Sequence, residues 1–149
     1  MPTLAKNKKG LFDYQILETF EAGLVLTGKE VKSVKNGHIN LKGSYISLKK
    51  GEAFLVNCHI SAYKKAGIQP DYNPTQSRKL LLHKKEIKHL LGRIQQKGLT
   101  LIPIKVYTKG AIIKLEFGLA KGKKKIDKRE IIKKRDMDRE IQRAMKNQL

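Results

Sequence analysis

The sequence contains no tryptophan and a single cysteine, Cys58. One cysteine excludes an intramolecular disulfide framework and is consistent with a reducing compartment. No apolar run approaches the roughly 18 residues that a membrane-spanning helix requires, and residues 1–10 lack the apolar segment of a secretory signal. We therefore expect a cytoplasmic protein that has no membrane partner.

Patterns that support catalysis or metal binding are also scarce. The histidines are not spaced as zinc ligands. A Gly-x4-Gly-Lys match occurs at residues 23–29, but Glu30 follows where a phosphate-binding loop needs Ser or Thr to hold Mg²⁺. The carboxylates are scattered among lysines, whereas a two-metal nuclease needs several acids at one point. We predict that the protein is not an enzyme and needs no metal or cofactor.

Positive charge is what the sequence has in excess. Lys and Arg number 33 against 13 Asp and Glu, which gives a formal net charge of +20. Such a charge favours a polyanionic partner, above all nucleic acid. Aromatic residues are only 6% of the chain, so platforms for stacking single-stranded bases are few. A structured RNA, read by its shape, phosphates and 2′-hydroxyls, fits best. A general basic RNA chaperone or ribosomal protein remains the alternative.

Local patterns predict strands in most of the chain. Residues 1–10 are polar and basic, and we expect a loose arm there. A strand is predicted over residues 13–20, and one hairpin turns at Lys50-Gly51. A long loop follows over residues 62–78. A second hairpin covers residues 99–120 and turns near Lys109-Gly110.

Two helices are predicted between these strands. Thr27 with Glu30 has the spacing of a capping box, and Asn36-Gly37 provides a helix end. The stronger helix is predicted over residues 78–98, where apolar residues recur at helical spacing and Gly98 follows. The fold class is mainly β with α (α+β). We predict a small OB-like β-barrel of about six strands with two or three helices.

The composition changes after Ala120. Residues 121–149 contain twelve Lys and Arg and five Asp and Glu, so this segment carries +7 and the remainder +13. We predict two parts: an OB-like RNA-binding barrel at residues 1–120 and a basic C-terminal tail at residues 121–149. The tail has few apolar side chains to bury, and we expect it to be disordered in the free protein.

Four stretches together closely resemble one protein family. FEAGLVLTGKEVKSVKNG, GEAFLVNCHIS, RKLLLHKKEI and GLAKGKKKIDKRE resemble the SmpB family, the SsrA-binding proteins, in order and over nearly the whole chain. The resemblance implies an OB-like barrel and an adaptor that is not an enzyme. It implies binding to the tRNA-like domain of transfer-messenger RNA and delivery of that RNA to stalled bacterial ribosomes, the process of trans-translation. We expect a monomer.

The resemblance also implies which residues contact RNA. The family's positions in contact with the tRNA-like domain match Asn7, Glu21, Leu81 and Lys114. Lys114 suits a phosphate, and Asn7 can hydrogen-bond a base or a 2′-hydroxyl. Glu21 can accept a hydrogen bond from a base amino group or an RNA hydroxyl, although a structural ion pair is the alternative. Leu81 can be a core residue or an apolar platform.

The resemblance further implies that the tail becomes helical on the ribosome and lies in the empty mRNA channel beside the decoding centre. Its predicted ribosome-binding residues are Lys124, Asp127, Lys128, Arg129, Lys133, Lys134 and Met145. The helix is predicted over residues 126–147, with Asp127 capping its N-terminus. Ile126 stands where the resemblance places His or an aromatic residue in many members, so the resemblance does not carry base stacking over to this position, and apolar packing is the alternative.

Overall fold

The computed structural model describes residues 2–96, 98–123 and 125–147 of the chain. Within these ranges the chain is an α+β protein, as predicted from the sequence. The helices are α1 (Lys8–Asp13), α2 (Gly28–Lys35), the 3-10 helix η1 (Lys64–Ala66), α3 (Lys84–Ile94) and α4 (Lys125–Asn147). The strands are β1 (Thr3–Lys6), β2 (Tyr14–Leu24), β3 (Ile39–Asn40), β4 (Tyr45–Lys49), β5 (Glu52–Val56), β6 (His59–Ile60), β7 (Arg78–Leu81), β8 (Leu99–Lys109) and β9 (Ile112–Gly122).

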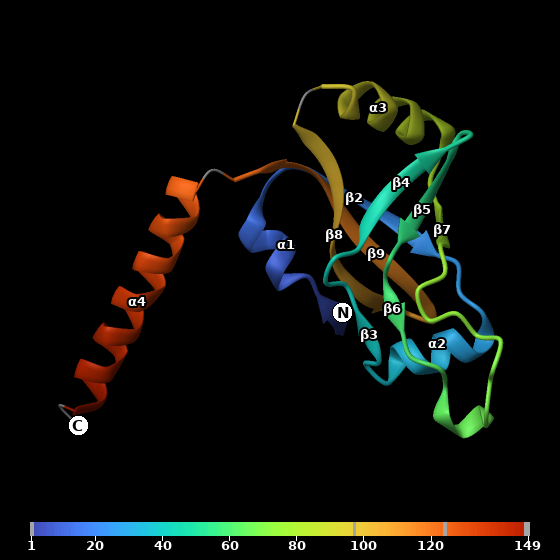
Figure 1. The fold of residues 1–149 in the computed structure, drawn as a ribbon, viewed down its shortest axis with the longest axis horizontal. Coiled ribbons are helices and arrows are strands. Elements are labelled where there is room, and N and C mark those ends of the chain that lie inside the picture. The colour runs from blue at the N-terminus through green and yellow to red at the C-terminus, as the bar shows by residue number, and fades with distance from the viewer. Residues whose placement is uncertain (1, 97, 124, 148–149) are drawn as a thin grey trace.

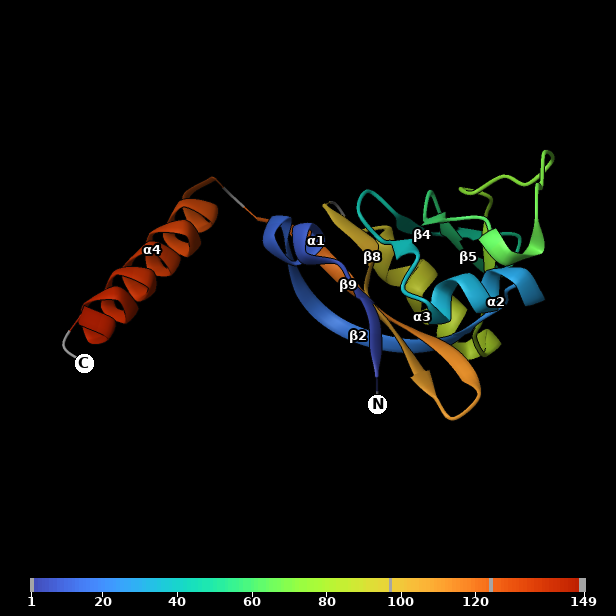
Figure 2. The same ribbon diagram turned by 90° about the horizontal axis from the view of Figure 1, so that it is seen from below.

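An antiparallel sheet in the order β1-β8-β9-β2-β7-β5-β4 forms the body, and β3 pairs separately with β6. The sheet is strongly curved, with α3 across one end and α4 standing away from it (Figures 1 and 2). Both predicted hairpins are confirmed. The second turns from β8 into β9 at Gly110, whose φ of 63° suits glycine.

The concave side of the sheet holds the hydrophobic core. Alternate residues of β9 point into it, namely Ile113, Leu115, Phe117 and Leu119, and all four are buried. Leu90 of α3 is also fully buried and contributes to the same core. Because side chains alternate along a strand, Lys114 lies on the opposite, outward face of β9.

The predicted barrel closure is not confirmed. Within the described residues β1 and β4 are the two edges of the sheet, and no hydrogen-bonded ladder joins them. The curvature brings β4 close to β8, but β1 already pairs with β8. The next residue, Asn7, donates its side-chain amide N–H to the carbonyl oxygen of Pro103 and its backbone N–H to the carbonyl oxygen of Ile104. Pro103 has no backbone N–H that could donate to a neighbouring strand. β1 and Asn7 therefore occupy the outer edge of β8 over residues 103–107, and this stretch is not available for a ladder with β4.

The loose arm predicted for residues 1–10 is wrong. Thr3–Lys6 forms β1 against β8, and the next residues form α1. Asn7 connects the two elements, because its side-chain oxygen accepts a hydrogen bond from the backbone N–H of Gly10 at 3.0 Å and so caps α1. The arm is fixed by backbone pairing and by Leu4 and Ala5, which pack against the core, and these few residues are too short a stretch to give a clear apolar pattern.

The helix predicted over residues 78–98 begins six residues later than expected. Residues 78–81 form β7, between β2 and β5. Arg78 and Leu80 are buried while Lys79 and Leu81 are exposed, which is the alternation of a strand. From Lys84 onward the helical period is confirmed as α3. The first four residues pair with strands that are distant in sequence, and this overrides the local helical pattern.

The predicted capping box of α2 is confirmed, and its glutamate has a second role. Thr27 and Glu30 exchange side-chain to backbone hydrogen bonds, each 3.2 Å long. The Glu30 carboxylate is buried and lies 2.6 Å from Nη2 of Arg78, also buried. Tyr72 donates a hydrogen bond to the same carboxylate at 3.0 Å. The buried pair thus fixes α2, β7 and the loop after η1 together.

The tail is a single helix, α4, over Lys125–Asn147. Its bounds agree with the helix that the sequence predicts for the ribosome-bound state. From Asp136 to Lys146 every side chain is exposed. No helix within the described ranges has both the length and the apolar character to cross a membrane. The disorder predicted for the free tail stays a prediction, because the structure shows only the helical form.

Candidate RNA interface

The sheet brings three of the four predicted RNA-contacting residues together on its outer face. Gly23 of β2 is directly opposite Lys114 of β9 and also directly opposite Leu81 of β7. Glu21 precedes Gly23 by two residues on β2, so its side chain leaves the same face. Lys114, Leu81 and Glu21 therefore surround one point of the sheet, at which Gly23 contributes no side chain.

Gly23 is buried, and its lack of a side chain lets Leu81 lie close over its backbone. A Cβ atom built on it would lie 3.3 Å from Cδ1 of Leu81, a tighter contact than is usual. Leu81 is 60% exposed, so it is not a core residue. Of the two predicted alternatives for Leu81, the apolar platform agrees with its position. Leu81 and Lys114 therefore place an exposed apolar surface beside a cation on the outer face, over the buried backbone of Gly23.

The carboxylate of Glu21 is surrounded by one hydroxyl and two ammonium groups. The Tyr107 hydroxyl donates a hydrogen bond to its carboxylate. The ammonium groups of Lys109 and Lys114 lie 3.8 Å and 3.9 Å from Oε1. The hydrogen bond from Tyr107, aided by the two lysine charges, lowers the pKa of Glu21 below its usual range. Glu21 is therefore an ionised acceptor, and its side chain remains 41% exposed.

The two lysine contacts are the structural ion pair that was the alternative role for Glu21. They are compatible with a contact between Glu21 and RNA. An exposed ion pair at nearly 4 Å is weak and is readily exchanged for another partner. RNA that approaches Lys109 and Lys114 with its phosphates would leave Glu21 free to accept from a base or a ribose. The RNA contact of Glu21 stays a prediction.

Asn7 is not part of this group. Its side chain is only 4% exposed. Its amide nitrogen donates to the carbonyl oxygen of Pro103 at 2.8 Å, and its oxygen caps α1. Both ends of the amide are therefore satisfied inside the body. The predicted RNA contact of Asn7 stays a prediction, and the structure gives this residue a role in holding α1 against β8.

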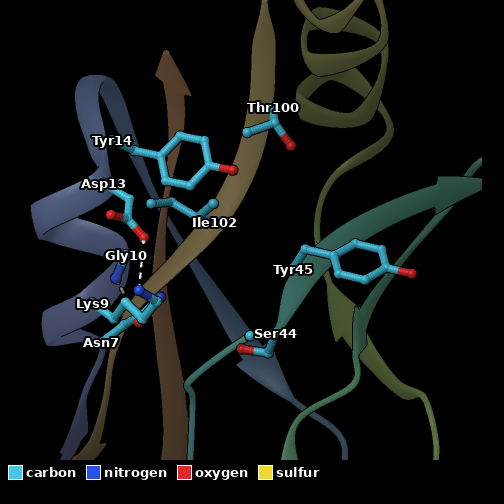
Figure 3. Close-up of a pocket in the computed structure, with 10 residues that line it drawn as sticks. Asn7, Lys9, Gly10, Asp13, Tyr14, Ser44, Tyr45, Thr100 and Ile102 are labelled. Carbon is cyan, nitrogen blue, oxygen red and sulfur yellow. Dashed lines mark hydrogen bonds and ion pairs between the residues drawn. The ribbon is translucent and has the colours of Figure 1, made fainter. Parts of the chain in front are cut away.

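A pocket of about 470 Å³ lies beside Asn7, between α1, β8 and the edge strand β4. Tyr14 lies on the wall formed with α1, and Tyr45 lies across the pocket from it (Figure 3). Lys9 and Asp13 of α1 also line it, with Nζ of Lys9 3.5 Å from Oδ2 of Asp13. The sequence gives no sign of this pocket, because α1 was not predicted.

The tail residues are spread along α4. Lys124 lies outside the described residues. Asp127 is in the first turn of α4, which begins at Lys125. Its N-cap role was predicted for the helix on the ribosome and stays a prediction. Lys128 is half-buried, and its ammonium lies 3.1 Å from Oδ1 of Asp13. The remaining predicted residues, Arg129, Lys133, Lys134 and Met145, are exposed.

Two neighbours of Glu21 were missed from the sequence. Tyr107 and Lys109 both belong to β8, and Tyr107 is directly opposite Lys114. A hairpin that turns near residues 109–110 fixes this pairing by counting back from the turn, so the signal was present. Among the described residues, no group of three or more His, Cys, Asp or Glu side chains is placed to hold a metal ion.

Comparison with known proteins identifies the family. The family model described as SmpB protein matches residues 4–147. The SsrA-binding protein of Shouchella clausii is 53% identical over 98% of this chain and 93% of its own length. The SsrA-binding protein of Gloeothece citriformis is 52% identical over 96% of this chain and 92% of its own length.

A solved structure agrees with these relatives. It is described as "tmRNA-SmpB: a journey to the center of the bacterial ribosome", and its matching chain is 44% identical. The match has a TM-score of 0.69 and covers 84% of this chain and 87% of the other. The resemblance predicted from four sequence stretches is thus confirmed over nearly the whole length, and the chain belongs to the SmpB family of SsrA-binding proteins.

Proposed function

We propose that this chain is the RNA-binding adaptor of trans-translation. It binds the tRNA-like domain of transfer-messenger RNA and carries that RNA to stalled ribosomes. One observation carries the proposal: Glu21, Leu81 and Lys114, matched to the family's RNA contacts from separate motifs, converge around Gly23 on one face of the sheet. Leu81 and Lys114 are far from Gly23 along the chain, and the pairing of β2 with β7 and β9 brings them to it.

Each residue around Gly23 has a distinct role in this proposal. Lys114 pairs with a phosphate, and Lys109 is close enough to assist it. Glu21 accepts a hydrogen bond from a base amino group or a ribose hydroxyl, which gives selectivity that phosphate contacts lack. Leu81 supplies an exposed apolar surface for a base or a ribose beside Lys114.

The tail acts at a different stage. Residues 121–149 carry +7, and the α4 side chains beyond Arg135 are exposed. We propose that α4 lies in the empty mRNA channel near the decoding centre, where ribosomal RNA phosphates neutralise Arg129, Lys133 and Lys134. The apolar side chains of Met137, Ile141 and Met145 are too few to stabilise the helix in water. We therefore infer that the distal tail is stably helical only on the ribosome.

The remaining expectations follow from this assignment. The protein works as a monomer in the cytoplasm, where ribosomes are, and performs no chemistry of its own. We also retain the OB-like description of the body as a proposal, because the curved sheet brings β4 against β8 although no ladder closes it within the described residues.

Sequencing the RNA that co-purifies with the full-length protein tests the proposal. One dominant species with a tRNA-like domain is expected, and it should be lost when Glu21, Leu81 and Lys114 are replaced together by alanine. A broad spread of ribosomal RNA, unchanged in the triple variant, would instead support a general basic RNA chaperone and reject the adaptor assignment.

A further inference from the structure

A groove lies between the tip of the β4–β5 hairpin and α3. It has a volume of about 440 Å³. Residues 50–52 line it from the hairpin, and Lys84, Ile87, Lys88 and Leu91 line it from α3. Figure 1 shows this hairpin tip beside α3 at one end of the sheet.

The groove continues into the surface that carries the proposed RNA site. A second hollow of about 240 Å³ shares Glu52, Lys84 and Ile87 with the groove and also includes Leu81. Leu81 is directly opposite Gly23 of β2. In the sheet order β2-β7-β5, the hairpin strand β5 is two strand spacings, about 10 Å, from β2. An RNA strand that contacts Leu81 is therefore close enough to enter the groove.

The lining combines apolar and cationic side chains. Ile87 is buried, and Leu91 one turn further along α3 is 37% exposed. Lys50, Lys84 and Lys88 surround these two residues, and all three lysines are exposed. A sugar–phosphate backbone has the matching chemistry, because its ribose offers an apolar edge and its phosphates are anionic.

The three lysines are available for such a partner. Glu52, an acid that lines the groove, already pairs with Lys79 at 3.4 Å. Within the ranges that the structure describes, Lys50, Lys84 and Lys88 form no ion pair with a carboxylate.

These lysines also stand where lysine is locally unfavourable. Lys50 has a φ of 50° and Gly51 a φ of 74°, in a two-residue hairpin turn whose first position favours Asn, Asp or Gly. Lys84 is the first residue of α3, where positive charge is disfavoured. Lys88 follows four residues later, a spacing at which like charges repel. A cost that the fold does not require indicates a role in binding.

We propose that this groove binds the sugar–phosphate backbone of the same RNA that the body recognises, so that the RNA contact extends from Gly23 over Leu81 to α3. The proposal rests on the proposed function, because its partner is that RNA. Phosphates pair with Lys50, Lys84 and Lys88, and a ribose packs on Leu91. Such contacts fix the orientation of the RNA and add affinity but read no sequence.

A polyanion fits this lining better than a protein segment does. Lysine is depleted at the centre of protein–protein interfaces. Lysine–phosphate contacts, in contrast, supply much of the affinity of nucleic-acid complexes. The continuity with Leu81 then favours the RNA already bound on the sheet over a second, separate RNA.

A gel-shift titration of the full-length protein with a transcript of the tRNA-like domain, repeated over a series of salt concentrations, tests the groove. The slope of log affinity against log salt reports how many phosphates the protein neutralises. Lys50→Asn, Lys84→Gln and Lys88→Gln together should weaken binding about tenfold or more at moderate salt. The magnitude of the slope should fall by about three, about one for each lysine.

Lys50→Asn alone separates RNA contact from folding. Because Asn is favoured at this positive φ, the body should melt at the same temperature as the wild type or at a higher one. The magnitude of the salt slope should nevertheless fall by about one. A lower melting temperature would contradict the strain assigned to Lys50, and an unchanged slope would remove Lys50 from the RNA contact.

The matched control removes three exposed lysines elsewhere. Lys35→Gln on α2 and Lys64→Gln with Lys65→Gln on η1 lie at the other end of the body from α3 (Figure 1). This variant has the same net charge as the groove variant, and its slope should change by less than about one. Hydroxyl-radical footprinting should show one stretch of RNA backbone that loses protection in the groove variant and keeps it in the control.

The outcomes separate the groove from the function on which it rests. Equal slopes in the groove and control variants would overturn the groove, because only total charge would then matter. An unchanged slope together with weaker sedimentation with ribosomes would assign the groove to ribosomal RNA and also overturn the proposal. If the wild type showed no preference for the tRNA-like transcript over an unrelated RNA of the same length, the adaptor assignment itself would fail, and the groove with it.

Discussion

The outer face around Gly23 and the tail helix are both basic, yet they are built in different ways. Around Gly23, strand register fixes where Glu21, Leu81 and Lys114 stand, and a buried core lies behind them. Along α4, the cationic side chains from Arg129 to Lys146 are exposed, and among the described residues the contacts with the body are made by Lys128 and Arg135. The cationic side chains around Gly23 therefore have a fixed geometry, whereas those of α4 can adapt to a partner.

This difference suggests separate roles for the two basic regions in RNA binding. A fixed array of an acceptor, an apolar surface and cations can select one RNA shape, because the cost of ordering those side chains was met when the body folded. A helix with few apolar contacts meets that cost only when it binds. We therefore expect the body to determine which RNA is bound, and the tail to determine what happens after that RNA reaches the ribosome.

The largest expected effect is a loss of stability when the buried ion pair of the body is broken. Arg78→Ala removes one partner of the buried pair with Glu30 and leaves an unpaired carboxylate, which should cost about 3–5 kcal/mol of unfolding free energy. Chemical denaturation followed by circular dichroism measures it. Arg139→Ala on the exposed face of α4 is the matched control and should leave the body's unfolding unchanged. Equal losses in the two variants would contradict the contrast between body and tail.

The same buried pair predicts how the body's stability depends on pH. Burial alone would raise the pKa of Glu30, but hydrogen bonds from Arg78 and Thr27 outweigh it, and the pKa is lowered below its ordinary value of 4.5. Because the folded-state pKa is the lower one, the stabilisation is fully present above about pH 4.5 and is lost as the pH falls through the folded value.

Unfolding free energy measured between pH 7 and pH 3 checks this dependence. Glu30→Gln should be less stable than the wild type at pH 7 and should lose less stability on acidification. Parallel curves for the two proteins would show that Glu30 does not contribute to the acid sensitivity.

A smaller effect is expected at the RNA-facing surface itself. Glu21→Gln removes a charged acceptor while keeping the shape, and should weaken binding of the tRNA-like domain about tenfold, since hydrogen bonds to a charged acceptor are stronger than those to a neutral one. Gel-shift titration measures the affinity, and a melting curve checks the fold. If Glu21 only repelled phosphates, the substitution would tighten binding, and that result would remove Glu21 from the RNA site.

The smallest effect is expected from removing the tail. A chain that ends after Lys123 keeps the whole of β9 and the backbone bond to Asp13. It should bind the tRNA-like domain within about threefold of the full-length protein at moderate salt, where the lost tail charges are largely screened. Affinity should still fall steeply with salt, because body phosphate contacts release counterions. Loss of specific binding would place recognition in the tail.

The elements that the sequence predicted correctly have local signals. Thr27 and Glu30 form a capping box within four residues, and the hairpin turns at Lys50-Gly51 and near Gly110 lie between clear alternating runs. The sequence-based predictions were wrong where contacts with residues distant in the chain determine the secondary structure. Residues 78–81 are a strand because Arg78 reaches Glu30, 48 residues earlier in the chain, and no window of local sequence contains both.

The candidate site divides in the same way. The resemblance supplied Glu21, Leu81 and Lys114, but their meeting at Gly23 depends on β2 pairing with both β7 and β9, which periodicity cannot predict. Tyr107 could have been found from the hairpin register. The ion pair of Asp13 with Lys128 could not, because α1 is formed by a short segment whose cap, Asn7, is bound to the distant strand β8.

The most direct test of the division between body and tail replaces Asp127, Lys128 and Arg129 together by alanine and follows three steps in a reconstituted stalled-translation assay. Binding of the tRNA-like domain and recruitment to the ribosome should remain within about threefold of wild type, because the body's cations are untouched. Tagging of the stalled peptide should be abolished. Asp136→Asn, a change of an exposed acid further along α4, serves as the control and should still tag. A triple variant that tags normally, or that already fails to bind the RNA, would contradict the account.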